Sequence, residues 1–197
     1  MSTKVFDGGL KNPARVAIGI DQSLTGFALT VLDVDDASSY ITWVYKSPYF
    51  GVERLIDIRQ FLLDHFDYCD EKNWIISDIA MEGTVLATFA AIVMGELSAL
   101  VRLTIYDRFK GAHRFPLKIP PMTLKKFAAG TGKAKKAEML LKVYKRYGVE
   151  FTSDDAADSY GLARMAAGVF IDSTEKAILD KIRADESSYR DAPRLEG

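Results

Sequence analysis

The sequence has little cysteine, no long apolar run and almost no net charge, and each shortage excludes a class of protein. The single cysteine, Cys69, cannot form an intrachain disulfide, and no Cys/His cluster predicts a zinc site. No apolar run reaches the length of a membrane span, so we expect no membrane partner. Residues 1–15 lack the apolar core of a signal peptide. We therefore expect a cytoplasmic protein.

The net charge of −1 argues against a uniformly basic nucleic-acid binder, but the charge is unevenly distributed. One acidic residue, Glu138, stands among nine basic ones between residues 118 and 146, a local charge of 9 − 1 = +8. The basic residues are Lys118, Lys125, Lys126, Lys133, Lys135, Lys136, Lys142, Lys145 and Arg146. Such a segment is typical of a surface that contacts a phosphate backbone, and equally of a solvated helical face.

The order of apolar patterns predicts an α/β fold with a mixed five-stranded sheet and helices on both faces. An antiparallel meander is expected from the strands 16–22, 27–34 and 41–47, and parallel strands from 74–82 and 115–119. Helices are expected at 53–68, 86–106, 122–128, 134–147 and 153–170. We divide the chain into a polar lead-in (1–15), one domain (16–171) and a charged tail (172–197) that forms a helix or is partly disordered.

Four acids stand out by position. Asp21 and Glu82 lie at the ends of apolar strands, and Asp155 and Asp158, three residues apart, share one face of a helix. A carboxylate in such a place is costly to bury unless it is paired or bound to a cation. Converging oxygen ligands suit Mg²⁺ or Mn²⁺ rather than zinc.

Each acid also has a purely structural explanation. Asp21 could cap the turn at residues 23–26, and Glu82 could end its strand at the surface. Asp155 and its neighbour Asp154 fall in a first helical turn, where the helix dipole favours negative charge. Thr152 or Ser153 is a natural cap for that helix. Taken alone, the acidic helix start is better explained as structural; the combination with the upstream acids favours a metal site.

The motifs GIDQSLTG, IAMEG and DAAD, in this order, resemble those of RuvC-type Holliday junction resolvases, particularly phage-encoded members, of the RNase H-like superfamily. The resemblance runs from about Val16 to Ala167. It implies that Asp21, Glu82, Asp155 and Asp158 are the catalytic metal ligands, and that two Mg²⁺ ions bind per site, with Mn²⁺ able to substitute. A phage-encoded member would act in the host cytoplasm.

Between these motifs, LKKFAAGTGKAKK resembles the DNA-contacting segment of the same family. The match implies that Lys125 and Lys136 lie near the scissile phosphates, and we add Lys126 and Lys133 as DNA-binding residues. Two positions depart from the family pattern. Gln22 replaces the proline most often seen after the first aspartate, and Val85 stands where cellular resolvases carry an aromatic residue, a role that Phe89 could take over.

The resemblance implies a Mg²⁺-dependent endodeoxyribonuclease that resolves four-way DNA junctions by paired phosphodiester hydrolysis, with no small-molecule cofactor. Paired symmetric cuts favour a homodimer, with the helix at 86–106 as candidate interface because of its small residues. Two alternatives stay open: a related nuclease acting on flaps, forks or other branched DNA, and a non-catalytic branched-DNA-binding module. GTGK is not a Walker loop, since Phe127 stands where the motif needs glycine.

Overall fold

The computed structural model describes residues 2–12, 14–83, 91–109 and 115–185 and contains one mixed sheet. Its strands are β1 (Ser2–Asp7), β2 (Arg15–Asp21), β3 (Phe27–Asp33), β4 (Tyr40–Lys46), β5 (Ile75–Glu82) and β6 (Leu117–Ile119). The strand order is β1-β4-β3-β2-β5-β6. The strands β2, β3 and β4 form the expected antiparallel meander, and β5 and β6 run parallel to β2.

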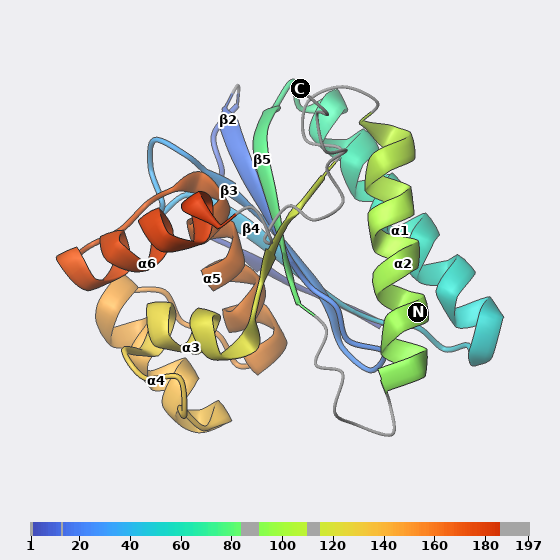
Figure 1. Ribbon diagram of the computed structural model, residues 1–197. Coiled ribbons are helices and arrows are strands. Elements are labelled where there is room, and N and C mark those ends of the chain that lie inside the picture. Colours follow the sequence, from blue (N-terminus) through green and yellow to red (C-terminus); the bar gives the residue numbers. More distant parts are fainter. Residues whose placement is uncertain (1, 13, 84–90, 110–114, 186–197) are drawn as a thin grey trace, which may run out of the picture.

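Six helices cover the two faces of this sheet (Figure 1). They are α1 (Gly51–Glu71), α2 (Ala91–Arg108), α3 (Pro121–Ala129), α4 (Lys136–Tyr147), α5 (Asp154–Ala167) and α6 (Ser173–Ala184). Figure 1 shows α1 and α2 on one face and α3 to α6 on the other. Among the described residues, no helix is long and apolar enough to cross a membrane. The prediction of an α/β fold with helices on both faces is confirmed.

The two faces of β2 differ in side-chain size, and this difference decides how closely each helix layer approaches. Val16, Ile18 and Ile20 belong to the apolar cluster beneath α1 and α2. The opposite face carries Ala17 and Gly19, and α5 packs directly on it. A Cβ atom at Gly19 would lie 2.1 Å from the Ser159 carbonyl oxygen and 2.3 Å from the Ala163 amide nitrogen. The backbone of α5 therefore rests on the backbone of β2.

A buried chain of hydroxyl groups fixes the position of α5 along the sheet. The Ser159 hydroxyl donates to the Ala156 carbonyl at 3.0 Å, so it accepts from Thr30 Oγ1, 2.8 Å away. Thr30 in turn accepts from Thr42 Oγ1 at 2.7 Å. The donors thus run in one direction from β4 through β3 to α5, and a slip of the helix would leave buried hydroxyls unpaired.

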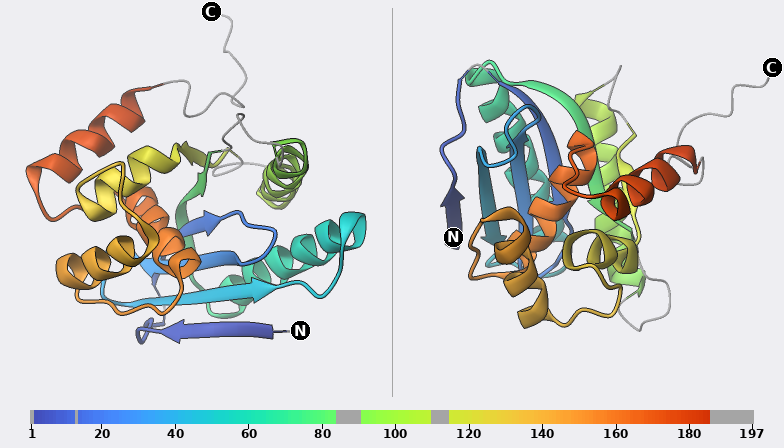
Figure 2. Two further views of the ribbon diagram at one scale, coloured as in Figure 1. Left: turned by 90° about the horizontal axis from the view of Figure 1, so that it is seen from below. Right: turned by 90° about the vertical axis from the view of Figure 1, so that its left-hand side faces the viewer.

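The structure adds to the sequence-based prediction at both ends of the chain. The residues taken as a polar lead-in contain β1, which pairs with β4 and adds a sixth strand at the edge of the sheet (Figure 2). Phe6 of this strand packs edge-on against Phe151, 5.2 Å between ring centroids. At the other end, the expected tail helix forms as α6, and its Ile178, Leu179 and Ile182 join the core. Both β1 and α6 are therefore parts of the domain.

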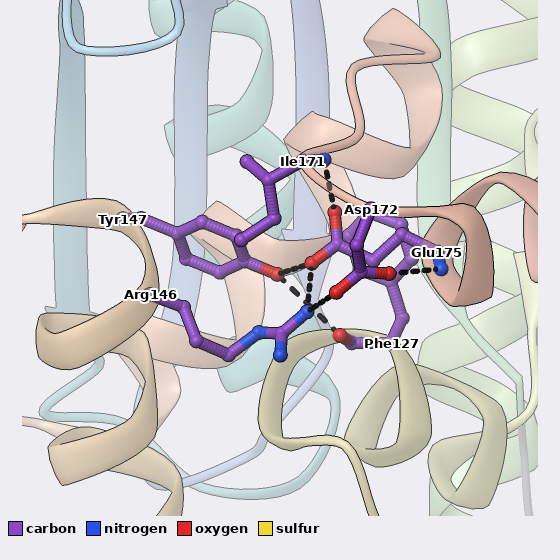
Figure 3. Close-up of polar contacts among 6 residues, drawn as sticks. All are labelled: Phe127, Arg146, Tyr147, Ile171, Asp172 and Glu175. Carbon is purple, nitrogen blue, oxygen red and sulfur yellow. Dashed lines mark hydrogen bonds and ion pairs between the residues drawn. The ribbon is translucent and has the colours of Figure 1, made fainter.

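The helix α6 is held by a cluster of polar contacts around a buried carboxylate, Glu175 (Figure 3). Arg146 on α4 pairs with Glu175 at 2.5 Å and with Asp172 at 2.8 Å. The Tyr147 hydroxyl and the Ile171 amide also donate to Glu175, each at 2.9 Å. Asp172 caps α6 by accepting from the Glu175 amide at 2.8 Å. The charge of Arg146 is therefore paired with acids of the same domain, so the basic segment presents one charge fewer to solvent than the sequence suggests.

We predict that Gly19→Ala lowers the free energy of unfolding by about 3 kcal/mol, because the new methyl group meets backbone atoms that cannot rotate away. The matched control is Gly95→Ala in α2, where an added Cβ meets nothing within 4 Å. That change should stabilise the chain by about 0.5–1 kcal/mol. Urea unfolding measures both, and equal effects of the two substitutions would contradict the close packing of α5 on β2.

We predict that Arg146→Met lowers the free energy of unfolding by about 3–5 kcal/mol, because it leaves Glu175 buried without its cation. Lys176→Met is the control, since it breaks an exposed ion pair between Lys176 and Asp180, which both lie on α6. Its cost should stay below about 1 kcal/mol. Adding Glu175→Gln to Arg146→Met should restore part of the loss, and an additive double variant would contradict a buried pair.

Candidate active site

The site begins where two neighbouring parallel strands end. Regular pairing of β2 with β5 runs to Ile20 and Met81. The next residues, Asp21 and Glu82, therefore lie side by side at the carboxyl ends of the two strands. Asp21 is only 6% exposed. Its carboxyl group is hydrogen-bonded to that of Glu82. This contact raises the pKa of Asp21 and opposes the rise in the pKa of Glu82.

The helix α5 adds the other two acids from the opposite side. Asp155 lies over Gly26 at the start of β3, where a Cβ atom would be 2.3 Å from the Asp155 Oδ2. Asp158, one helical turn later, is partly buried. Its Oδ1 is buried without a hydrogen-bond partner among the residues that the structure describes. The close packing of α5 on Gly19 thus carries both carboxylates toward the ends of β2 and β5.

The electrostatics show that the four acids act on one another. Burial raises the pKa of Asp21 well above its ordinary value, and the charges of Glu82, Asp158 and Asp155 raise it further. Burial, followed by repulsion from Glu82, raises the pKa of Asp158 to about 7. The pKa of Glu82 is raised chiefly by burial. Three of the four acids therefore hold protons more tightly than free carboxylates do, as expected where buried acids converge.

Among the predicted lysines whose side chains the structure describes, Lys125 acts on these acids. Lys125 on α3 lowers the pKa of both Glu82 and Asp158, so its ammonium group is close enough to influence them. Lys126 and Lys133 are exposed. Lys136 begins α4, and its side chain lies outside the described part of the structure. Val85 and Phe89, the candidate junction-opening positions, also lie outside the described residues.

The chemistry of these groups fits a hard divalent cation. They offer only carboxylate oxygens, they repel one another, and Asp158 Oδ1 is a buried acceptor that lacks a donor in the described chain. Within the described residues, however, no three His, Cys, Asp or Glu side chains are grouped tightly enough to hold a metal ion as they stand. Asp21 and Glu82 instead share a hydrogen bond. Binding a common cation would therefore replace that bond and draw the side chains together.

Three local features of the site were not expected from the sequence. Ser153 occupies the cap position of α5 but makes no capping hydrogen bond, and its hydroxyl donates to Asp155 at 3.3 Å. The turn after β2 contains a bond from the Thr25 amide to Ser23 Oγ at 3.3 Å, whereas Asp21 bonds Glu82. From the sequence, Gly26 is expected only to form a turn. Its close approach to the Asp155 carboxylate has no signal in the sequence.

Comparison with known proteins gives similarity in structure alone. No family model and no curated protein sequence matches this chain. A solved structure of RuvC from T. thermophilus in complex with a Holliday junction substrate matches with a TM-score of 0.58 and 22% identity, over 76% of this chain and 90% of that one. A Thermus thermophilus RuvC structure matches with a TM-score of 0.59 and 21% identity, over 85% and 96%.

The yeast mitochondrial Holliday junction resolvase Ydc2 matches with a TM-score of 0.53 and 17% identity, over 91% of this chain and 85% of that one. At such identities the likeness concerns the fold. The expected sheet and helix arrangement is therefore confirmed, with one strand more than predicted, and the chain has the fold of the RuvC-type Holliday junction resolvases.

Proposed function

We propose that this protein is a structure-selective endonuclease that resolves four-way DNA junctions by metal-dependent phosphodiester hydrolysis. The observation that carries the proposal is the convergence of Asp21, Glu82, Asp155 and Asp158 from two strand ends and one helix. Support also comes from the fold, because one structure with the same fold is of a RuvC bound to a Holliday junction substrate.

In this proposal the four carboxylates hold Mg²⁺, or Mn²⁺ in its place, and two ions per site are expected. When bound, the cations lower the pKa of an attacking water and stabilise the leaving 3′ oxygen. Each of the four acids would bind the cations as a carboxylate. Lys125 partly offsets their charge and stabilises negative charge that develops on the phosphate.

The lysines beyond the site position the DNA without reading its sequence. Lys126 is exposed on α3, the helix that also carries Lys125, and Lys133 is exposed on the loop that follows it. Lys136 is proposed as a further phosphate contact on α4. Contacts of this kind bind the backbone through charge and make affinity depend on salt.

We also propose that the protein acts as a homodimer, since two symmetric cuts require two sites. The exposed face of α2 supports this arrangement. Ile92 is 77% exposed and Leu103 60% exposed, and both recur with Ala99 and Tyr106 at the spacing of one helix face. The buried Leu97, Val101 and Ile105 hold the other face of α2 in the core. Of the small residues expected at the interface, Ala87 and Ala90 lie outside the described residues.

We predict that Asp158→Asn abolishes cleavage, lowering kcat by at least about 100-fold, because a neutral amide cannot replace a carboxylate ligand. Asp154→Asn is the matched control, as it makes the same chemical change four residues earlier on α5, and it should retain cleavage. The measurement uses labelled four-way junction, fork and linear duplex, each with and without Mg²⁺. Junction binding without metal should persist in both variants.

The same assay separates the alternatives. Symmetric nicking of the junction alone supports the resolvase. Faster cleavage of forks or flaps than of the junction would favour the related branched-DNA nuclease. Binding without cleavage under any metal would favour the non-catalytic module. Cleavage by Asp158→Asn at the wild-type rate would sink the assignment of the site.

We predict that the metal-free protein loses stability as the pH rises from about 5 to 8. The pKa of Asp158 is about 7 in the folded chain against an ordinary value near 3.8. The folded chain therefore binds a proton more tightly than the unfolded chain, so stability present below pH 4 is lost as the pH rises through 7. The loss should be on the order of 2–4 kcal/mol.

Urea unfolding in EDTA at the two pH values measures this loss, and Mg²⁺ should reverse it at pH 8 by binding the folded state. In Asp158→Asn the pH dependence should be smaller and the response to Mg²⁺ weaker. An unchanged pH profile in that variant would show that another group is responsible.

A further inference from the structure

Gln22 follows Asp21 directly and bonds to the backbone of the second acid. Its side chain is only 3% exposed, and Nε2 donates to the Glu82 carbonyl oxygen at 2.6 Å. The orientation of the amide is fixed by this contact, because a carbonyl oxygen can only accept. One hydrogen bond therefore joins the residue after Asp21 to the residue that carries the neighbouring carboxylate.

This bond lies just beyond the point where regular pairing of β2 with β5 stops at Ile20 and Met81. On its other side, Glu82 pairs with Ile119 of β6, and the Gly83 amide donates to the Ile119 carbonyl at 2.8 Å. The Glu82 backbone is thus held from both sides, by β6 and by the Gln22 amide. Without the amide, only β6 would hold Glu82 beyond the end of the β2–β5 ladder.

Stability alone does not explain a glutamine at this position. Its Oε1 is buried and has no hydrogen-bond partner within the described residues, which makes burial of the amide unfavourable. An apolar side chain of the same length would fill the space and bury no unpaired oxygen, although it would leave the Glu82 carbonyl without this donor. The two effects on stability oppose each other, whereas only glutamine fixes the Glu82 backbone relative to Asp21.

We propose that Gln22 is a positioning residue whose amide holds Glu82 at the separation from Asp21 at which both carboxylates bind one cation. The inference rests on the proposed function, since it assumes that these two acids are metal ligands. It differs from the role of the proline common at this position in the resembled family, because a proline ring has no donor to offer the neighbouring strand.

The test compares Gln22→Met with Gln60→Met. Methionine matches the length of glutamine without its donor, and Gln60 makes an exposed hydrogen bond to Asp64 on α1, at 2.7 Å. Mn²⁺ dissociation constants are measured by electron paramagnetic resonance of the free ion. Junction affinity without metal, kcat, KM and the midpoint of urea unfolding are measured on the same preparations.

For Gln22→Met we expect Mn²⁺ binding about tenfold weaker and a lower kcat at limiting Mn²⁺. Its KM, its junction affinity without metal and its urea midpoint should stay near those of the wild type, and excess Mn²⁺ should restore kcat. Gln60→Met should match the wild type throughout.

Unchanged Mn²⁺ affinity in Gln22→Met, with a wild type that binds Mn²⁺, overturns the positioning role alone. A large fall in the urea midpoint also overturns it, because the amide would then be structural. A wild-type protein that binds no Mn²⁺ overturns the proposed function and this inference together.

Discussion

The absence of a side chain at Gly19 is the constraint on which the rest of the structure depends. It lets the backbone of α5 lie against β2, with Ser159 and Ala163 at distances that no Cβ atom would permit. The buried hydroxyls of Thr30, Thr42 and Ser159 then fix the helix along the sheet. Because Asp155 and Asp158 are on this helix, the geometry of the acids follows from the contact of two backbones.

The same arrangement stores electrostatic repulsion in the folded chain. Burial, followed by repulsion among the acids, raises the pKa of Asp21, Glu82 and Asp158, which means that folding works against their ionisation. Lys125 relieves part of this repulsion. The hydrophobic clusters on both faces of the sheet must outweigh the remainder.

The sequence predicted most of the fold because its strands and helices are marked by apolar periodicity. It did not predict β1, since STKVFD has no continuous apolar face and is held by backbone pairing with β4. Nor did it predict the packing of α6, whose buried Glu175 looks like a surface charge until Arg146 is seen beside it. The acids could be proposed from their positions at strand ends. The contacts of Gln22 and Gly26 could not, because they join segments that are distant in the chain.

The four acids are spread over 158 − 21 = 137 positions of the chain, and this spacing bears on when the site can exist. The strand β2, which carries Asp21, is synthesised early, but the partners Asp155 and Asp158 come near the end of the domain. Contacts so distant in sequence form late in folding, since the intervening loop entropy must first be overcome. A nascent or partly unfolded chain therefore has the basic helices without the assembled acids. In the proposed endonuclease, cutting therefore has to await completion of the fold.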